Sequence, residues 1–69
     1  MAMNIASKVF EFKGKYYWAD KSYVPFIGPE TMIFPSDSEG NVTDWDDLYC
    51  DRTDMSLEEC IEEFKKYNE

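Results

Sequence analysis

Histidine is absent from the sequence, and cysteine occurs only twice among its 69 residues. Histidine is the commonest general base and a very common metal ligand, so its absence argues against most acid–base catalysis and most transition-metal sites. One pair of cysteines is too few for a cysteine-rich zinc site. Cys50 lies between Tyr49 and Asp51, neither of which is a cation that would activate its thiolate. We therefore predict that the chain is not an enzyme and needs no cofactor.

Long apolar runs are also missing. No stretch approaches the ~20 apolar residues that a membrane-spanning helix needs. Residues 1–7 lack both the basic region and the long apolar region of a secretory signal. We therefore expect a cytoplasmic protein in which Cys50 and Cys60 are reduced and lie in or near the core. A disulfide between these two cysteines is the alternative.

Positive charge is scarce in the second half of the chain. Residues 36–69 carry twelve Asp and Glu against three Lys and Arg, whereas residues 1–35 carry three against four. The net charge of −8 therefore belongs entirely to the second half. Such a charge repels nucleic acid and anionic lipid, so we expect neither a nucleic acid nor a membrane as a direct ligand.

Aromatic residues, by contrast, are abundant. The chain has five Phe, five Tyr and two Trp, and each of these side chains can bury roughly 150–250 Å². A disordered acidic segment would carry far fewer. We therefore predict one small folded domain over residues 1–69, near the lower size limit for a single core.

The first half of the chain favours β-strands. Runs rich in β-branched and aromatic residues at 8–12 and 15–19 flank the pair Lys13-Gly14, where glycine supplies the positive φ of a tight hairpin. A third strand is predicted at 31–35 and ends at Pro35. Residues 1–6 carry no comparable pattern and are expected to be loosely ordered.

Two segments are harder to assign. Residues 23–29 are apolar but contain two prolines and a glycine, which predicts an irregular connection or an edge segment. After the polar turn at 36–41, a fourth strand is predicted at 47–51. The alternative is a short helical turn that places Trp45, Leu48 and Tyr49 on one face.

The C-terminal segment predicts a helix over residues 57–67. Ser56 and Glu59 have the spacing of a capping box. Apolar residues then recur at helical period, as one stripe made of Leu57, Cys60, Ile61, Phe64 and Tyr67. The predicted fold class is therefore α+β, with an antiparallel sheet of three to four strands and one C-terminal amphipathic helix packed on it.

The polar segment 37–47 has the look of a calcium loop, but its register is wrong. With Gly40 at the sixth position of the EF-hand pattern, the first ligand position is Pro35 and the twelfth is Asp46 rather than Glu. We therefore predict no dedicated metal site. A weak divalent-cation site in this segment is the alternative.

The acids of the second half form rows. On strands, alternate side chains are ~7 Å apart, and on a helix the residues i and i+4 are ~6 Å apart. Such rows can occupy the Lys and Arg sites that receive phosphates on another protein. Trp45 and Tyr49, or the hairpin edge at 16–18, would anchor the contact. The predicted partner-binding residues are Asp44, Trp45, Asp46, Asp47, Tyr49, Asp51, Glu58, Glu59, Glu62 and Glu63.

Both features also have simpler explanations. Net negative charge keeps a small aromatic-rich protein soluble without any partner. The surplus aromatic side chains can pack on both faces of the sheet instead of lying exposed for a partner.

A small, histidine-free, strongly acidic and aromatic-rich chain resembles the host-takeover proteins that bacteriophages and mobile elements encode. Among these are anti-CRISPR and anti-restriction proteins, several of which are DNA mimics. Segments 30–34, 40–45 and 48–49 read ETMIF, GNVTDW and LY, and with the acidic helix they are similar to short proteins of phage and bacterial genomes. The likeness covers most of residues 30–64 and contains no motif tied to an activity. It implies inhibition by surface occupancy in the host cytoplasm.

These features predict a non-catalytic inhibitor that covers a basic, nucleic-acid-binding surface of a larger protein. The alternative is a small structural or assembly protein that self-associates, or joins a complex, through the apolar segment 23–29. Salt separates the two hypotheses, because screening weakens a charge-driven contact and leaves an apolar one nearly unchanged.

Overall fold

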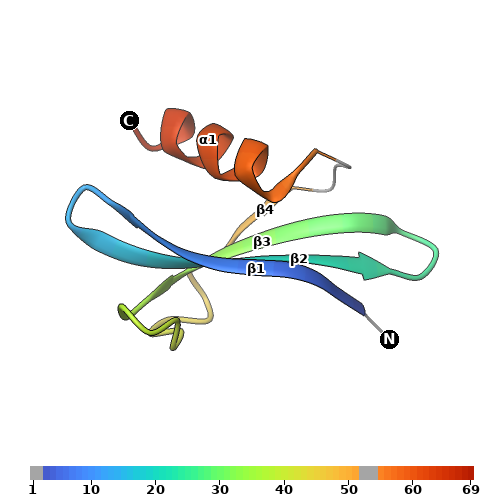
Figure 1. Ribbon diagram of the computed structural model, residues 1–69, viewed down its shortest axis with the longest axis horizontal. Coiled ribbons are helices and arrows are strands. Elements are labelled where there is room, and N and C mark those ends of the chain that lie inside the picture. Colours follow the sequence, from blue (N-terminus) through green and yellow to red (C-terminus); the bar gives the residue numbers. More distant parts are fainter. Residues whose placement is uncertain (1–2, 52–54) are drawn as a thin grey trace.

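The sheet is built from strands in the order in which they occur along the chain. The computed structural model describes residues 3–51 and 55–69, apart from the side chains of Met3, Cys50 and Asp51 (Figure 1). Each strand pairs antiparallel with the next. The predicted α+β class, with an antiparallel sheet and a C-terminal helix, is confirmed. The elements in chain order are β1 (Met3–Phe12), β2 (Lys15–Val24), β3 (Gly28–Ser36), β4 (Tyr49–Asp51) and α1 (Leu57–Tyr67).

The β1–β2 hairpin closes through the two residues expected from the sequence. Lys13 and Gly14 have φ values of 53° and 78°, which is the pair of positive values that a type I′ turn requires. Phe12 and Lys15 are partners in register on either side of the turn. This turn type matches the right-handed twist of the strands. The register that it sets holds as far as Ala6 and Lys21, and an irregularity between Asn4 and Ala6 then shifts it by one residue.

Both strands of this hairpin are longer than predicted. Residues 3–6 were expected to be loosely ordered, but they pair with the end of β2 up to Tyr23. Polar side chains explain the extension: Asn4 Nδ2 and Ser22 Oγ both donate hydrogen bonds to the carboxylate of Asp20. Asp20 and Ser22 are buried, and burial of polar groups is tolerated when they bond one another.

The other two uncertain segments are resolved differently. Of residues 23–29, only 25–27 form a turn, and the rest complete β2 and β3. Near the strand predicted at 47–51, the three residues Tyr49–Asp51 pair with β3. The alternative of a helical turn around Trp45 is not observed, because residues 44–47 form irregular turns.

The core lies between α1 and one face of the sheet. The ring of Phe64 contacts those of Phe10 and Tyr17, with centroids 5.6 and 4.9 Å apart. Leu57, Cys60, Ile61 and Phe64 are the buried residues of α1. No helix in the described part of the chain is long and apolar enough to cross a membrane.

Tyr67 departs from that prediction, because 81% of its surface is exposed. At ~100° per residue, Tyr67 lies about 80° around the helix axis from Leu57, at the margin of the stripe. Its ring still contacts that of Tyr49, with the centroids 6.1 Å apart. The buried part of the stripe therefore runs from Leu57 to Phe64, about two turns of the helix.

The opposite face of the sheet is partly covered by the loop 37–48. Phe34 is buried, and its ring lies 6.2 Å from that of Trp18 and 4.9 Å from that of Trp45. Gly40 approaches Val9 so closely that a Cβ at position 40 would lie 2.9 Å from Val9 Cγ2. The helix and this loop therefore lie on opposite sides of the sheet (Figure 1).

Candidate functional site

The start of α1 is fixed by a complete capping box. Ser56 Oγ accepts a hydrogen bond from the backbone N–H of Glu59 at 3.2 Å, and Glu59 Oε1 accepts one from the N–H of Ser56 at 3.1 Å. Two N–H groups that a helix start leaves unpaired are thereby satisfied. The capping box fixes where α1 begins. Because the apolar stripe faces the sheet, the residues on the opposite side of the helix point outward.

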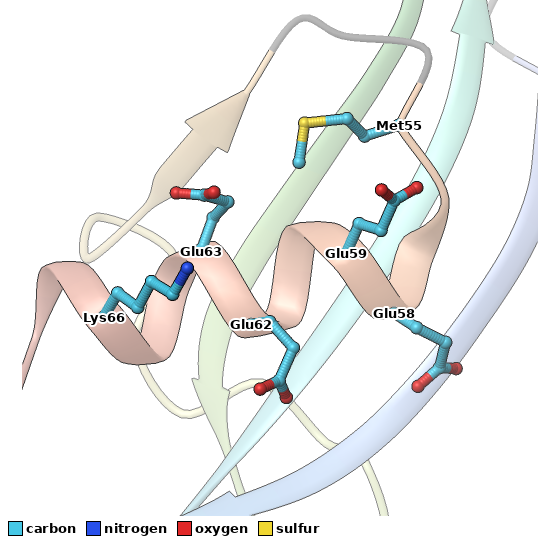
Figure 2. Close-up of a pocket in the computed structure, with 6 residues that line it drawn as sticks. All are labelled: Met55, Glu58, Glu59, Glu62, Glu63 and Lys66. Atoms are coloured by element: carbon cyan, nitrogen blue, oxygen red, sulfur yellow. The ribbon is translucent and has the colours of Figure 1, made fainter.

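Four glutamates occupy the outward face of the helix. We call Glu58, Glu59, Glu62 and Glu63 the helix surface, and all four are exposed. Figure 2 shows Glu59 and Glu63 on one side of the helix and Glu58 and Glu62 on the other. These are the i, i+4 rows that the sequence predicts.

A shallow hollow of about 300 Å³ lies over the helix surface. The four glutamates line it together with Met55 and Lys66. In Figure 2 the thioether of Met55 lies above the helix, on the side to which Glu59 and Glu63 point. The hollow thus combines two rows of carboxylates with one lysine and one apolar, polarisable side chain.

Some of these carboxylates also have partners within the chain. Lys8 Nζ lies 2.9 Å from Glu58 Oε2, and Lys65 Nζ lies 3.6 Å from Glu62 Oε2. All four of these side chains are substantially exposed, and such ion pairs contribute only about 0–1 kcal/mol. A cation from outside can therefore replace Lys8 or Lys65 at little cost in stability.

The acids of the loop form a second surface. We call Asp44, Trp45, Asp46 and Asp47 the loop surface, and all four are exposed. Asp44 Oδ1 accepts a hydrogen bond from the N–H of Asp46 at 3.0 Å, so Asp44 helps to shape the turn. Trp45 is 65% exposed although its ring edge packs on Phe34.

The helix surface and the loop surface are not continuous. Neighbouring residues on a strand point to opposite faces. Ile33 belongs to the core cluster with the helix residues, whereas Phe34 contacts Trp45 in the loop. The predicted binding residues are therefore divided between two sides of the molecule.

Two other predicted residues do not join either surface. Tyr49 is half-buried, and its ring packs against Phe64 at 5.5 Å on the helix side of the sheet. It therefore lies across the sheet from Trp45 instead of beside it. The side chain of Asp51 lies outside the described part of the chain.

Tyr67, exposed at the end of α1, was missed as a surface aromatic because its spacing fits the apolar stripe.

The segment considered as a weak cation site is organised around Asp37. Its Oδ1 accepts hydrogen bonds from the N–H groups of Glu39 and Asn41 at 2.8 and 2.9 Å, and its Oδ2 accepts one from Asn41 Nδ2 at 3.0 Å. The backbone N–H of Asn41, followed by its side chain, lowers the pKa of the Asp37 carboxyl below its ordinary value. Asp37 therefore stabilises a turn. Within residues 3–51 and 55–69, no group of three or more potential ligands is placed to hold a metal ion.

Comparison with known proteins found no relative of this chain. No protein-family model matches the sequence, and no curated protein or solved structure matches the chain. The functional assignment therefore depends on the geometry and chemistry of this chain.

Proposed function

We propose that the chain is a non-catalytic protein-binding inhibitor that covers a basic, nucleic-acid-binding surface of a larger protein. The proposal places the contact on the helix surface. In this proposal, β4 is the fourth strand of the sheet, and α1 is an amphipathic helix packed on the sheet. Proteins of this kind include those that phages encode to block host defence enzymes.

The observation that carries the proposal is the acidic hollow over α1. Lysine and arginine side chains combine an apolar stem with a charged head. A hollow with Met55 at its margin and carboxylates around it offers both a contact for the stem and acceptors for the head. Rows of carboxylates ~6 Å apart can meet several such heads at once.

The scaffold also favours the helix surface over the loop surface. A capped helix holds the backbone of its residues rigidly, whereas residues 44–47 lie in irregular turns, so less backbone freedom is lost on binding at the helix. The exposed ring of Tyr67 at the end of α1 adds an aromatic contact beside the acids, and Tyr is enriched at binding hot spots. Opposite charge speeds encounter, and desolvated aromatic contacts slow dissociation.

The test compares two double variants that change the net charge equally. Glu62→Gln with Glu63→Gln alters the helix surface, and Asp46→Asn with Asp47→Asn alters the loop surface. Tagged wild-type protein and both variants are used to capture proteins from host lysate, which are eluted by stepped salt and identified by mass spectrometry. We expect a nucleic-acid-binding protein that leaves in moderate salt and is captured at least about tenfold less by the helix variant alone.

Three outcomes would reject this assignment. Equal losses in both variants would mean that only overall charge matters. A loss confined to the loop variant would move the contact to the loop surface. Capture of structural proteins alone, resistant to salt, would leave the helix acids as a solubility device.

One observation favours the alternative of an assembly protein. The turn between β2 and β3 exposes Phe26 and Ile27 to solvent. Under that hypothesis, the wild-type protein forms complexes that persist when salt rises. Sedimentation in low and high salt measures the self-associating form directly.

A further inference from the structure

The turn between β2 and β3 has an unusual residue at a demanding position. Ile27 N–H donates to Val24 O at 3.1 Å, which closes a four-residue turn with Pro25 and Phe26 at its centre. Phe26 has a φ of 71°. Proline at the second position and a positive φ at the third are features of a type II turn.

Phenylalanine is poorly suited to that third position. A positive φ there favours glycine or asparagine, because a side chain on Cβ is strained in this region. Strain of this kind is normally offset by packing, but Phe26 is 106% exposed. The fold thus holds a strained aromatic residue in solvent. Such an outlier is evidence for a functional role.

The surroundings of Phe26 are also apolar. Ile27 and Tyr23 are exposed on the same turn and its flank. The strand register pairs Asn4 with Ser22, which places the exposed Ile5 at the same end of the hairpin. All four residues therefore lie at the end of the sheet that is far from the β1–β2 turn (Figure 1).

We propose that Phe26 is a preset anchor that inserts into an apolar pocket of a partner protein. The turn holds the ring away from the sheet before binding, so little conformational freedom is lost when the ring is buried. The inference goes beyond the proposed function, since it holds whether or not the helix surface binds.

A partner protein fits this end of the molecule better than a membrane does. Loops that insert into anionic membranes carry Lys or Arg beside the apolar residues. The nearest Lys in sequence, Lys21, instead donates to Met55 O at 2.7 Å. The net charge of −8 adds repulsion from such a surface.

A second copy of this chain fits less well for two reasons. Two copies each carry a charge of −8 and repel one another. In a symmetric contact each copy would also present the same projecting tip, and two projecting tips bury little surface against each other. A projecting tip therefore needs a concave partner that surrounds it.

The test is photo-crosslinking from position 26. The full chain with p-benzoylphenylalanine in place of Phe26 is illuminated in cells that naturally contain the protein. A chain with the same group in place of Lys15 is the control, since Lys15 is exposed and lies beside the β1–β2 turn, at the other end of the hairpin. We expect position 26 to crosslink to one protein that excess unlabelled wild-type chain displaces. Excess Phe26→Gly chain should displace it at least about tenfold less effectively, as for a hot-spot residue.

Melting temperatures show whether a variant that competes poorly is still folded. Glycine suits the observed φ, so Phe26→Gly should melt at the same temperature as the wild type or slightly above it. Phe26→Asn, which also tolerates a positive φ, serves as the second competitor. Equal competition by wild type and both variants would overturn the proposal, as would crosslinks only to lipid, only to a second copy, or to nothing.

Discussion

Gly40 joins two structural requirements in one residue. Its φ of 89° lies where glycine is favoured, and a Cβ at this position would lie 2.9 Å from Val9 Cγ2 and 3.6 Å from Trp18 Cδ1. The loop 37–48 can therefore approach the sheet closely only because position 40 has no side chain. The position of the loop surface depends on this contact.

We expect Gly40→Ala to lower the free energy of unfolding by about 2–4 kcal/mol, from backbone strain and overpacking against Val9. Gly14→Ala is the matched control, because Gly14 also has a positive φ but nothing lies within 4 Å of a Cβ there. It should cost only about 1–2 kcal/mol. Urea unfolding of both variants measures the difference. Equal costs would mean that the contact with Val9 is unimportant.

At the level of single residues, the sequence predicted features that depend only on neighbouring residues. It did not predict the exposure of residues at the edge of a pattern. The turn glycine Gly14 and the buried Cys60 follow from rules that need only neighbouring residues. Tyr67 was misplaced because an i+10 spacing leaves it at the edge of the apolar stripe, where exposure depends on how far the sheet extends. Nothing in the sequence around Pro25 and Phe26 indicates that the ring projects into solvent.

Among the elements, α1 depends most on its first turn. The capping box holds two backbone N–H groups that would otherwise be unpaired. We expect Ser56→Ala to lower the free energy of unfolding by about 1 kcal/mol. Far-UV circular dichroism during thermal unfolding measures the change. Glu59→Gln is the control, since its amide oxygen can still accept the hydrogen bond. A larger loss in Glu59→Gln than in Ser56→Ala would contradict this account.

The bounds of the helix were predicted more accurately than those of β1 and β2, and the reason is physical. The helix was predicted because a capping box and an apolar stripe agree over one short segment. The extensions of β1 and β2 were missed because Asn4, Asp20 and Ser22 are polar, and polar residues usually mark strand ends. Asp20 and Ser22 are buried, and Asp20 accepts one hydrogen bond from Ser22 on the same strand and one from Asn4 on β1. The sequence of one strand does not reveal the second of these bonds.

At the scale of the whole molecule, like-charge repulsion opposes folding. The chain carries fifteen acids against seven bases, and compacting them raises their mutual repulsion. We expect the melting temperature to rise by a few degrees between about 10 mM and about 500 mM salt. The double variant at Glu62 and Glu63 should show a smaller rise. A fall with salt would mean that pairs such as Lys8–Glu58 dominate instead.

The division of the acids between two sides could not be predicted from their positions in the sequence. Asp47 and Glu58 are close along the chain, but the sheet lies between the loop and the helix. Which side a segment covers depends on the alternation of neighbouring residues such as Ile33 and Phe34 on one strand. A shift of one residue in register would exchange the two faces.

The order of strands in the sheet has a consequence for synthesis on the ribosome. Each strand pairs with the one made just before it, so the sheet can form progressively while the chain emerges. The helix comes last, and until it docks, Phe10, Tyr17 and Ile33 have no cover on that face. Chains that end before residue 57 should therefore aggregate more readily and be degraded faster, because Leu57–Tyr67 are needed to cover this face.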